Sequence, residues 1–196
     1  MDSSMTVAVA LGAFFIWALV IYNRLVALRN RVANALAQID VQLKRRHDLV
    51  PNLVETARGY MSHERETLEA VINARDAARA AGQAASSAPG DARAMAAVAQ
   101  TEGVLSATLG RFFALAEAYP DLKANQNMMQ LSEEVTTTEN KLSFERQAFN
   151  DAVLQFNTAL ESFPAVMFAG MLGFKPATVL APLDSDIERK APAVRF

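Results

Sequence analysis

The chain has 196 residues, of which 52% are hydrophobic and 20% charged, so it can build one domain core with an appendage. Its formal net charge of -2 gives no electrostatic case for a nucleic-acid partner. The sequence has no cysteine, which excludes disulfides, thiolate metal ligands and cysteine nucleophiles within it. Alanine, leucine, arginine and glutamate, all good helix formers, are frequent and β-branched alternation is almost absent, so we expect an all-α fold.

The first predicted element is an apolar helix over residues 5–22, "MTVAVALGAFFIWALVIY". This uncharged run is long enough to cross the roughly 30 Å hydrocarbon layer of a bilayer. Trp17 and Tyr22 lie toward its end, where aromatic residues favour the membrane interface. A cleaved signal peptide is the competing interpretation, but no lysine or arginine precedes the run. We therefore predict a retained single-pass anchor in contact with the lipid bilayer.

Basic residues directly after the apolar run set the expected orientation. Arg24, Arg29 and Arg31 follow it, whereas only Asp2 and the terminal amine precede it. The positive-inside rule then places the rest of the chain in the cytoplasm, with the periplasm as the alternative.

The helix after the anchor carries an arginine and a proline where apolar residues would be expected. Arg46 falls in register with Ile39 and Leu53, so it should face inward. Pro51 has no amide hydrogen and leaves the carbonyl of His47 without its helical donor, which predicts a kink. We expect the helix to continue past Pro51 to about residue 81; a reversal near Gly59 is the alternative. The next obvious loop is 82–91, "GQAASSAPGD".

The last long helix is predicted from Asp121 to Phe163. Every seventh residue is apolar, which indicates packing against partner helices along most of its length, as in a coiled coil: Met128, Val135, Leu142, Phe149, Phe156 and Phe163. Thr138 and Glu145 break the companion set three residues further on. We predict a buried polar layer of Arg46, Thr138 and Glu145, with Arg46 turned toward Glu145.

The segment 163–174, "FPAVMFAGMLGF", is uncharged and rich in Met and Phe but too short to cross a bilayer. Three interpretations compete: a cap on the bundle, a segment lying on the membrane surface, or a contact between proteins. Three long helices would end it far from the membrane, and four would return it there. We favour three helices, and hence a cap with a distal assembly surface at Phe168, Met171 and Phe174.

Two long stretches, "YNRLVALRNRVANALAQIDVQLKRRHDLVPNLVETARGYMSHE" and the part running from "AYPDLKANQ" to "ESFPAVMFAGMLGF", resemble the LemA family. The resemblance implies a bacterial inner-membrane protein, single-pass, with an α-helical bundle and no established catalytic activity. It further implies a scaffold or adaptor role, with a membrane protease or another envelope protein as partner.

These observations predict an N-terminal transmembrane helix followed by an elongated antiparallel bundle of three long helices, or four if the chain reverses. The expected parts are the anchor (1–23), the bundle (24–175) and a tail (176–196). His47 and His63 lack the spacing of a helical zinc site, and no cofactor, metal or catalytic residue is predicted. We expect a self-associating scaffold; the alternative is an enzyme or accessory subunit acting on envelope components. An enzyme should gather titratable groups in a concave pocket, and a scaffold should show apolar seams.

Overall fold

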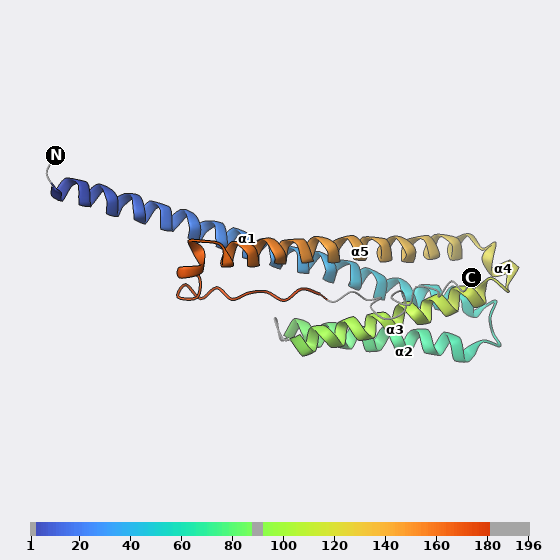
Figure 1. Ribbon diagram of the computed structural model, residues 1–196. Helices are drawn as coiled ribbons and strands as arrows, with labels where there is room; N and C mark the ends of the chain where they lie inside the picture. The colour runs from blue at the N-terminus through green and yellow to red at the C-terminus, as the bar shows by residue number, and fades with distance from the viewer. Residues whose placement is uncertain (1–2, 88–91, 181–196) are drawn as a thin grey trace, which may run out of the picture. The chain divides into compact units, whose positions relative to one another are not determined.

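The computed structural model describes residues 3–87 and 92–180. Four long helices and two short ones make up this described part, which contains no strand (Figure 1): α1 (Ser3–Arg58), α2 (Arg65–Ser87), α3 (Ala92–Ala116), α4 (Pro120–Lys123), α5 (Gln126–Glu161) and the 3₁₀ helix η1 (Ala165–Met167). The all-α prediction is confirmed, with four long helices in place of the favoured three.

Contacts divide the described chain into two compact units, to which α1 and α5 both contribute. We call residues 3–38 with 145–179 the anchor unit, and residues 39–144 the core unit. The expected division into an anchor (1–23), a bundle (24–175) and a tail (176–196) stays a prediction. Most of that tail, residues 181–196, lies outside the described residues.

The chain reverses directly after Gly59, so the expected helix from Pro51 to about residue 81 was wrong. The amides of Tyr60 and Met61 both bond to the carbonyl of Ala57, at 2.9 Å each, which ends α1. Met61 is fully buried, and burial of such a side chain contributes about 1.5–3 kcal/mol. The burial of Met61 therefore stabilises the turn that follows α1.

All five helices of the core unit contribute to one apolar cluster, to which the four long helices present stripes at helical spacing. The stripe of α1 includes Val50 and Leu53, that of α2 includes Leu68 and Val71, and α3 contributes Phe112. Leu122, Met128 and Val135 complete it from α4 and α5. Two of these helices, α1 and α3, also carry the buried charged residues Arg46 and Glu102.

Helix α5 begins and ends inside the helix predicted from Asp121 to Phe163. The side chain of Asn125 accepts a 3.0 Å bond from the amide of Met128, the arrangement of an N-cap. The helix ends at Glu161, two residues before Phe163. Phe163 precedes Pro164, and a proline disfavours helical geometry at the residue before it. Five members of the seven-residue repeat are buried, but Phe163 is 78% exposed.

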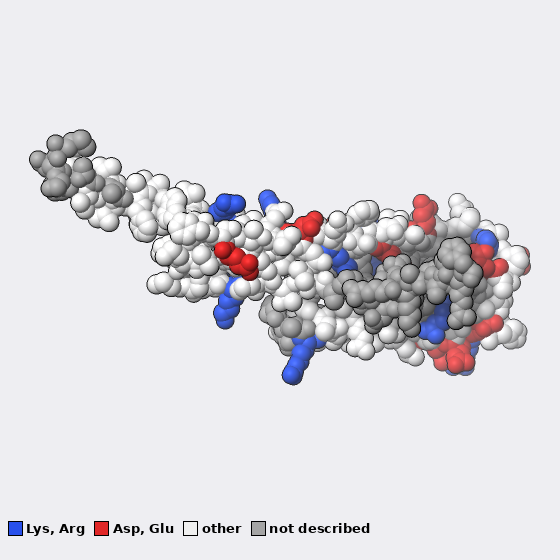
Figure 2. Space-filling view, in the orientation of Figure 1, with Lys and Arg blue, Asp and Glu red and all other residues white. Residues whose placement is uncertain are grey.

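The N-terminal part of α1 presents a bare apolar surface. All side chains from Leu11 to Val20 are exposed, and Figure 2 shows this stretch without acidic or basic groups on the visible face. Within the described residues, α1 is the one helix long and apolar enough to cross a membrane. Further along the anchor unit, Leu25 packs with Phe156 and Leu160 of α5.

A hydrogen bond joins the two turns at one end of the core unit. The hydroxyl of Tyr119 donates to Glu64 Oε1 at 2.9 Å, and this bond, followed by desolvation and the carboxylate charge, raises the pKa of Tyr119. The bond stabilises the fold fully below the ordinary tyrosine pKa of about 10 and is lost as pH rises through the higher folded value.

We expect the Tyr119 phenol to ionise at a higher pH than a free tyrosine. Absorbance at 295 nm, taken as the difference between the parent and Tyr119→Phe, measures its titration apart from Tyr22 and Tyr60. Glu64→Gln removes the carboxylate charge and should move the titration back toward lower pH. An unchanged titration in Glu64→Gln would contradict this assignment.

Candidate functional site

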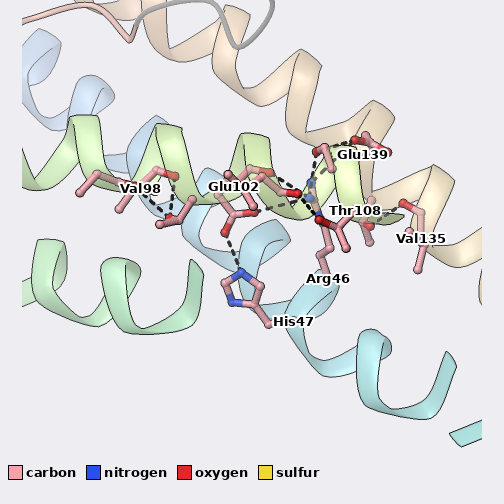
Figure 3. A network of polar contacts seen from close by, with 12 residues as sticks. Arg46, His47, Val98, Glu102, Thr108, Val135 and Glu139 are labelled. Atoms are coloured by element: carbon pink, nitrogen blue, oxygen red, sulfur yellow. Dashed lines mark hydrogen bonds and ion pairs between the residues drawn. The ribbon is translucent and has the colours of Figure 1, made fainter. Parts of the chain in front are cut away.

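Two adjacent residues of α1 meet an acid of α3 inside the core unit. His47 Nε2 lies 2.6 Å from Glu102 Oε1, and Arg46 Nη2 lies 3.7 Å from Glu102 Oε2 (Figure 3). All three side chains are buried. We call Arg46, His47 and Glu102 the polar cluster.

Helical register explains why these charged residues face inward. Arg46 follows Ile39 by seven residues and precedes Leu53 by seven, and all three are buried. On α3, Glu102 occupies the place between Val98 and Leu105 in an otherwise apolar stripe. The surrounding hydrophobic contacts thus fix both helices with their charges inside.

The guanidinium of Arg46 has further partners on α3 and α5. Its Nη2 donates to Ser106 Oγ at 2.9 Å and to the carbonyl of Glu102 at 3.4 Å. Ser106 in turn donates to Glu139 Oε1 at 2.9 Å, and Arg46 Nη1 lies 3.8 Å from that carboxylate. The polar cluster therefore joins α1 to α3, and Glu139 links it to α5 within the core unit.

The predicted polar layer is corrected at one residue. Arg46 and Thr138 are buried, but the carboxylates that Arg46 meets belong to Glu102 and Glu139, and not to Glu145. Thr138 turns its hydroxyl to the carbonyl of Val135, at 2.7 Å. Glu102, a buried acid on α3, is thus the buried partner of the Arg46 guanidinium.

The charges of the cluster are close but incompletely hydrogen-bonded. Among the described residues, Nε and Nη1 of Arg46 and Oε2 of Glu102 have no hydrogen-bond partner. Such atoms depend on the attraction of the opposite charge, which is stronger in a buried environment than in water. Removing one member would leave the other charges uncompensated.

At Pro51 the structure shows a continuous helix with a replacement donor. Arg75 of α2 donates through Nε to the carbonyl of His47, at 3.0 Å. This is the carbonyl that Pro51 deprives of its helical donor. The arginine thus satisfies a partly buried acceptor; the expected kink itself stays a prediction.

The chemistry available to the cluster is limited by its partners. A carboxylate holding a histidine resembles half of a general-base arrangement, which also needs a nucleophile within reach. The nearby hydroxyl of Ser106 is already hydrogen-bonded to Arg46 and Glu139.

A pocket of about 290 Å³ between α1 and α2 reaches His47 from outside, and Asp40, Lys44, Asp48 and Arg79 line it. Within the described part of the chain, no three His, Asp or Glu residues gather to hold a metal ion.

The predicted assembly surface lies in the anchor unit, where residues 163–174 form what we call the apolar cap. We call the apolar run of α1, residues 5–22, the anchor helix. The ring centroids of Phe168 and Phe14 of this helix are 6.4 Å apart, and those of Phe174 and Tyr22 are 5.7 Å apart. A fourth helix brings the chain back, so the cap lies beside the apolar run of α1, and the course expected for three helices was wrong. The distance of the cap from the membrane stays a prediction. Met171 is 87% exposed.

Comparison with known proteins supplies the family. The profile described as the LemA family matches residues 35–196. This chain belongs to the LemA family. The match contains the polar cluster and the apolar cap of this LemA-family chain, and it begins after the apolar run of residues 5–22.

A curated relative is similar along most of the chain. The magnetosome protein MamQ of Magnetospirillum gryphiswaldense is 23% identical over 181 residues, which cover 85% of this chain and 66% of MamQ. The LemA-family chain therefore spans just under two thirds of the length of this relative. The N-terminal apolar helix and this similarity together support an association with a membrane.

Proposed function

We propose that this LemA-family chain is a membrane-anchored, non-catalytic adaptor that binds another protein through a groove between α3 and α5. Residues 5–22 hold it in the inner membrane of a bacterium, and Arg24, Arg29 and Arg31 favour a cytoplasmic core unit. The partner class is a membrane or envelope protein, such as a membrane protease, and self-association through the same groove is the competing outcome.

The groove is the observation that supports this proposal. It has a volume of about 480 Å³ and lies in the core unit, where apolar side chains form most of its wall: Phe113, Ala116, Leu122, Met128 and Met129. Methionine side chains are flexible and polarizable, and such surfaces adapt to partner helices. Glu117 and Lys123 form an ion pair at its edge and could orient a charged partner.

The alternative, an accessory enzyme of the envelope, has one supporting observation. The pocket between α1 and α2 gathers titratable groups around His47. Its histidine, however, is buried and already bonded to Glu102. Because Nε2 of this histidine is already bonded to Glu102, the adaptor function is the better supported of the two.

A photo-crosslinking residue placed at Thr136, which lines the groove, tests the proposal in living cells. We expect a crosslinked product whose second component is a different membrane protein, and we expect Met129→Asp to reduce its yield at least tenfold. Val104→Asp is the matched control, because Val104 is 52% exposed and Met129 is 53% exposed, and Val104 does not line the groove. The control should leave the yield unchanged.

Two results would overturn the adaptor proposal. Equal losses in Met129→Asp and Val104→Asp would show that the groove is not specific. A product containing only two copies of this chain would assign the groove to self-association. Circular dichroism of each variant excludes loss of fold as the cause.

A further inference from the structure

The apolar cap exposes large hydrophobic side chains that the anchor unit leaves uncovered. Phe163, Val166, Met167, Met171 and Leu172 are all exposed, while Ala165, Ala169 and Phe174 face inward. Apolar groups gathered in one short segment indicate an interaction surface. Their position relative to the anchor helix indicates which partner covers them.

Ring contacts place the cap along the anchor helix. Phe174 lies beside Tyr22, at the interface end of the apolar run, and Phe168 lies beside Phe14. About 12 Å of helix separates Phe14 from Tyr22, at about 1.5 Å per residue. If Phe14 is inside the hydrocarbon layer, Phe168 is at nearly the same depth. Figure 1 shows the cap beside α1 at the end of α5.

The backbone of the cap suits a nonpolar environment. Lipid offers no hydrogen-bond partners, so irregular backbone inside a membrane must satisfy its own groups. The amides of Val166, Met167, Phe168 and Ala169 bond to carbonyls of residues 162–165, and those of Leu172, Gly173 and Phe174 bond to carbonyls of residues 168–170. Gly173 adopts a φ of +79° at the closing turn, a conformation that favours glycine.

Charged groups border the cap without entering it. Arg29 stacks over the ring of Phe174, 5.4 Å from its centroid, and the sequence places Lys175 immediately after it. The segment 163–174 itself contains no charged residue, and Glu161 precedes it at the end of α5. Basic groups at the edge of an apolar surface match the phosphates above the hydrocarbon layer.

We infer that the apolar cap is a second membrane contact, inserted into the same leaflet as the adjoining half of the anchor helix. The lipid bilayer is its occupant, and the cap enters and leaves from one side without crossing. This inference rests on the membrane anchoring of α1 proposed above and goes beyond it.

Single-cysteine labelling can measure the depth of the cap, because the chain has no native cysteine. The full chain is reconstituted in phosphatidylcholine–phosphatidylglycerol vesicles with the fluorophore NBD on Met171→Cys. We expect quenching by doxyl-labelled lipid and a several-fold lower iodide quenching constant than for NBD on Phe144→Cys. Phe144 is the matched control, since it is 71% exposed and belongs to the core unit.

A third label on Phe15→Cys separates this inference from the anchoring itself. Doxyl quenching at residue 15 but not at residue 171 overturns the inference and leaves the anchor intact. Absence of doxyl quenching at residue 15 overturns the anchoring and the inference together. Iodide protection at residue 171 without doxyl quenching assigns the cap to a protein partner and also overturns the inference.

Discussion

Replacing Glu102 by alanine is expected to lower the free energy of unfolding of the core unit by about 3–5 kcal/mol. The change leaves Arg46 and His47 buried without their shared carboxylate. A buried charge that loses its partner keeps the cost of desolvation and loses the compensating attraction. Urea unfolding followed by circular dichroism measures the loss.

Glu139→Ala is the control for this prediction. It removes the other carboxylate near the same guanidinium, but Glu139 is half exposed at 50% and lies 3.8 Å away. Its loss should cost about 1 kcal/mol or less. The double variant Arg46→Met/Glu102→Leu should lose less than Glu102→Ala, because no buried arginine is left unpaired. Equal effects of Glu102→Ala and Glu139→Ala would contradict the assignment.

The second prediction concerns the carbonyl freed by Pro51. Arg75→Ala should lower the free energy of unfolding by about 1–3 kcal/mol, because the His47 carbonyl loses its 3.0 Å donor. In a Pro51→Ala background the same change should cost distinctly less. An alanine at residue 51 supplies the helical amide that proline lacks.

A double-mutant cycle in urea measures this coupling between Pro51 and Arg75. Asp76→Ala is the control, since it removes only the exposed partner of the Arg75 guanidinium and should cost about 1 kcal/mol or less. If Arg75→Ala costs the same in both backgrounds, the arginine stabilises the fold by another route.

Local patterns were sufficient for the all-α class, for most of α5 and for the inward direction of Arg46. They were insufficient for the number of helices, because the decision depends on one turn. The local pattern is compatible with a reversal near Gly59, but no single stretch of sequence shows that other helices bury Met61 there. With the turn misjudged, the position of the apolar cap followed wrongly.

The partner of Arg46 carried a signal that the sequence analysis missed. Val98, Leu105 and Leu109 define a stripe on α3, and the position between the first two holds Glu102. An acidic residue within an apolar stripe predicts a buried charge as well as an arginine within one does. Glu145 is a plausible partner for Arg46 on sequence grounds because it also interrupts an apolar stripe. Which residues pair between two helices depends on the relative register of those helices, and the periodicity within one helix does not determine it.

The side chain of Asn157 holds the chain that leaves the apolar cap. Its amide nitrogen donates to the carbonyl of Ala177 at 2.8 Å, and its oxygen accepts from the amide of Ala177 at 2.9 Å. The segment between these residues is therefore a closed loop fastened at its base on α5. A pull transmitted along the chain from beyond Val179 would stretch these two bonds before it reached the cap. Mechanical load on the C-terminal side is thus borne by α5, and the apolar cap is shielded from it.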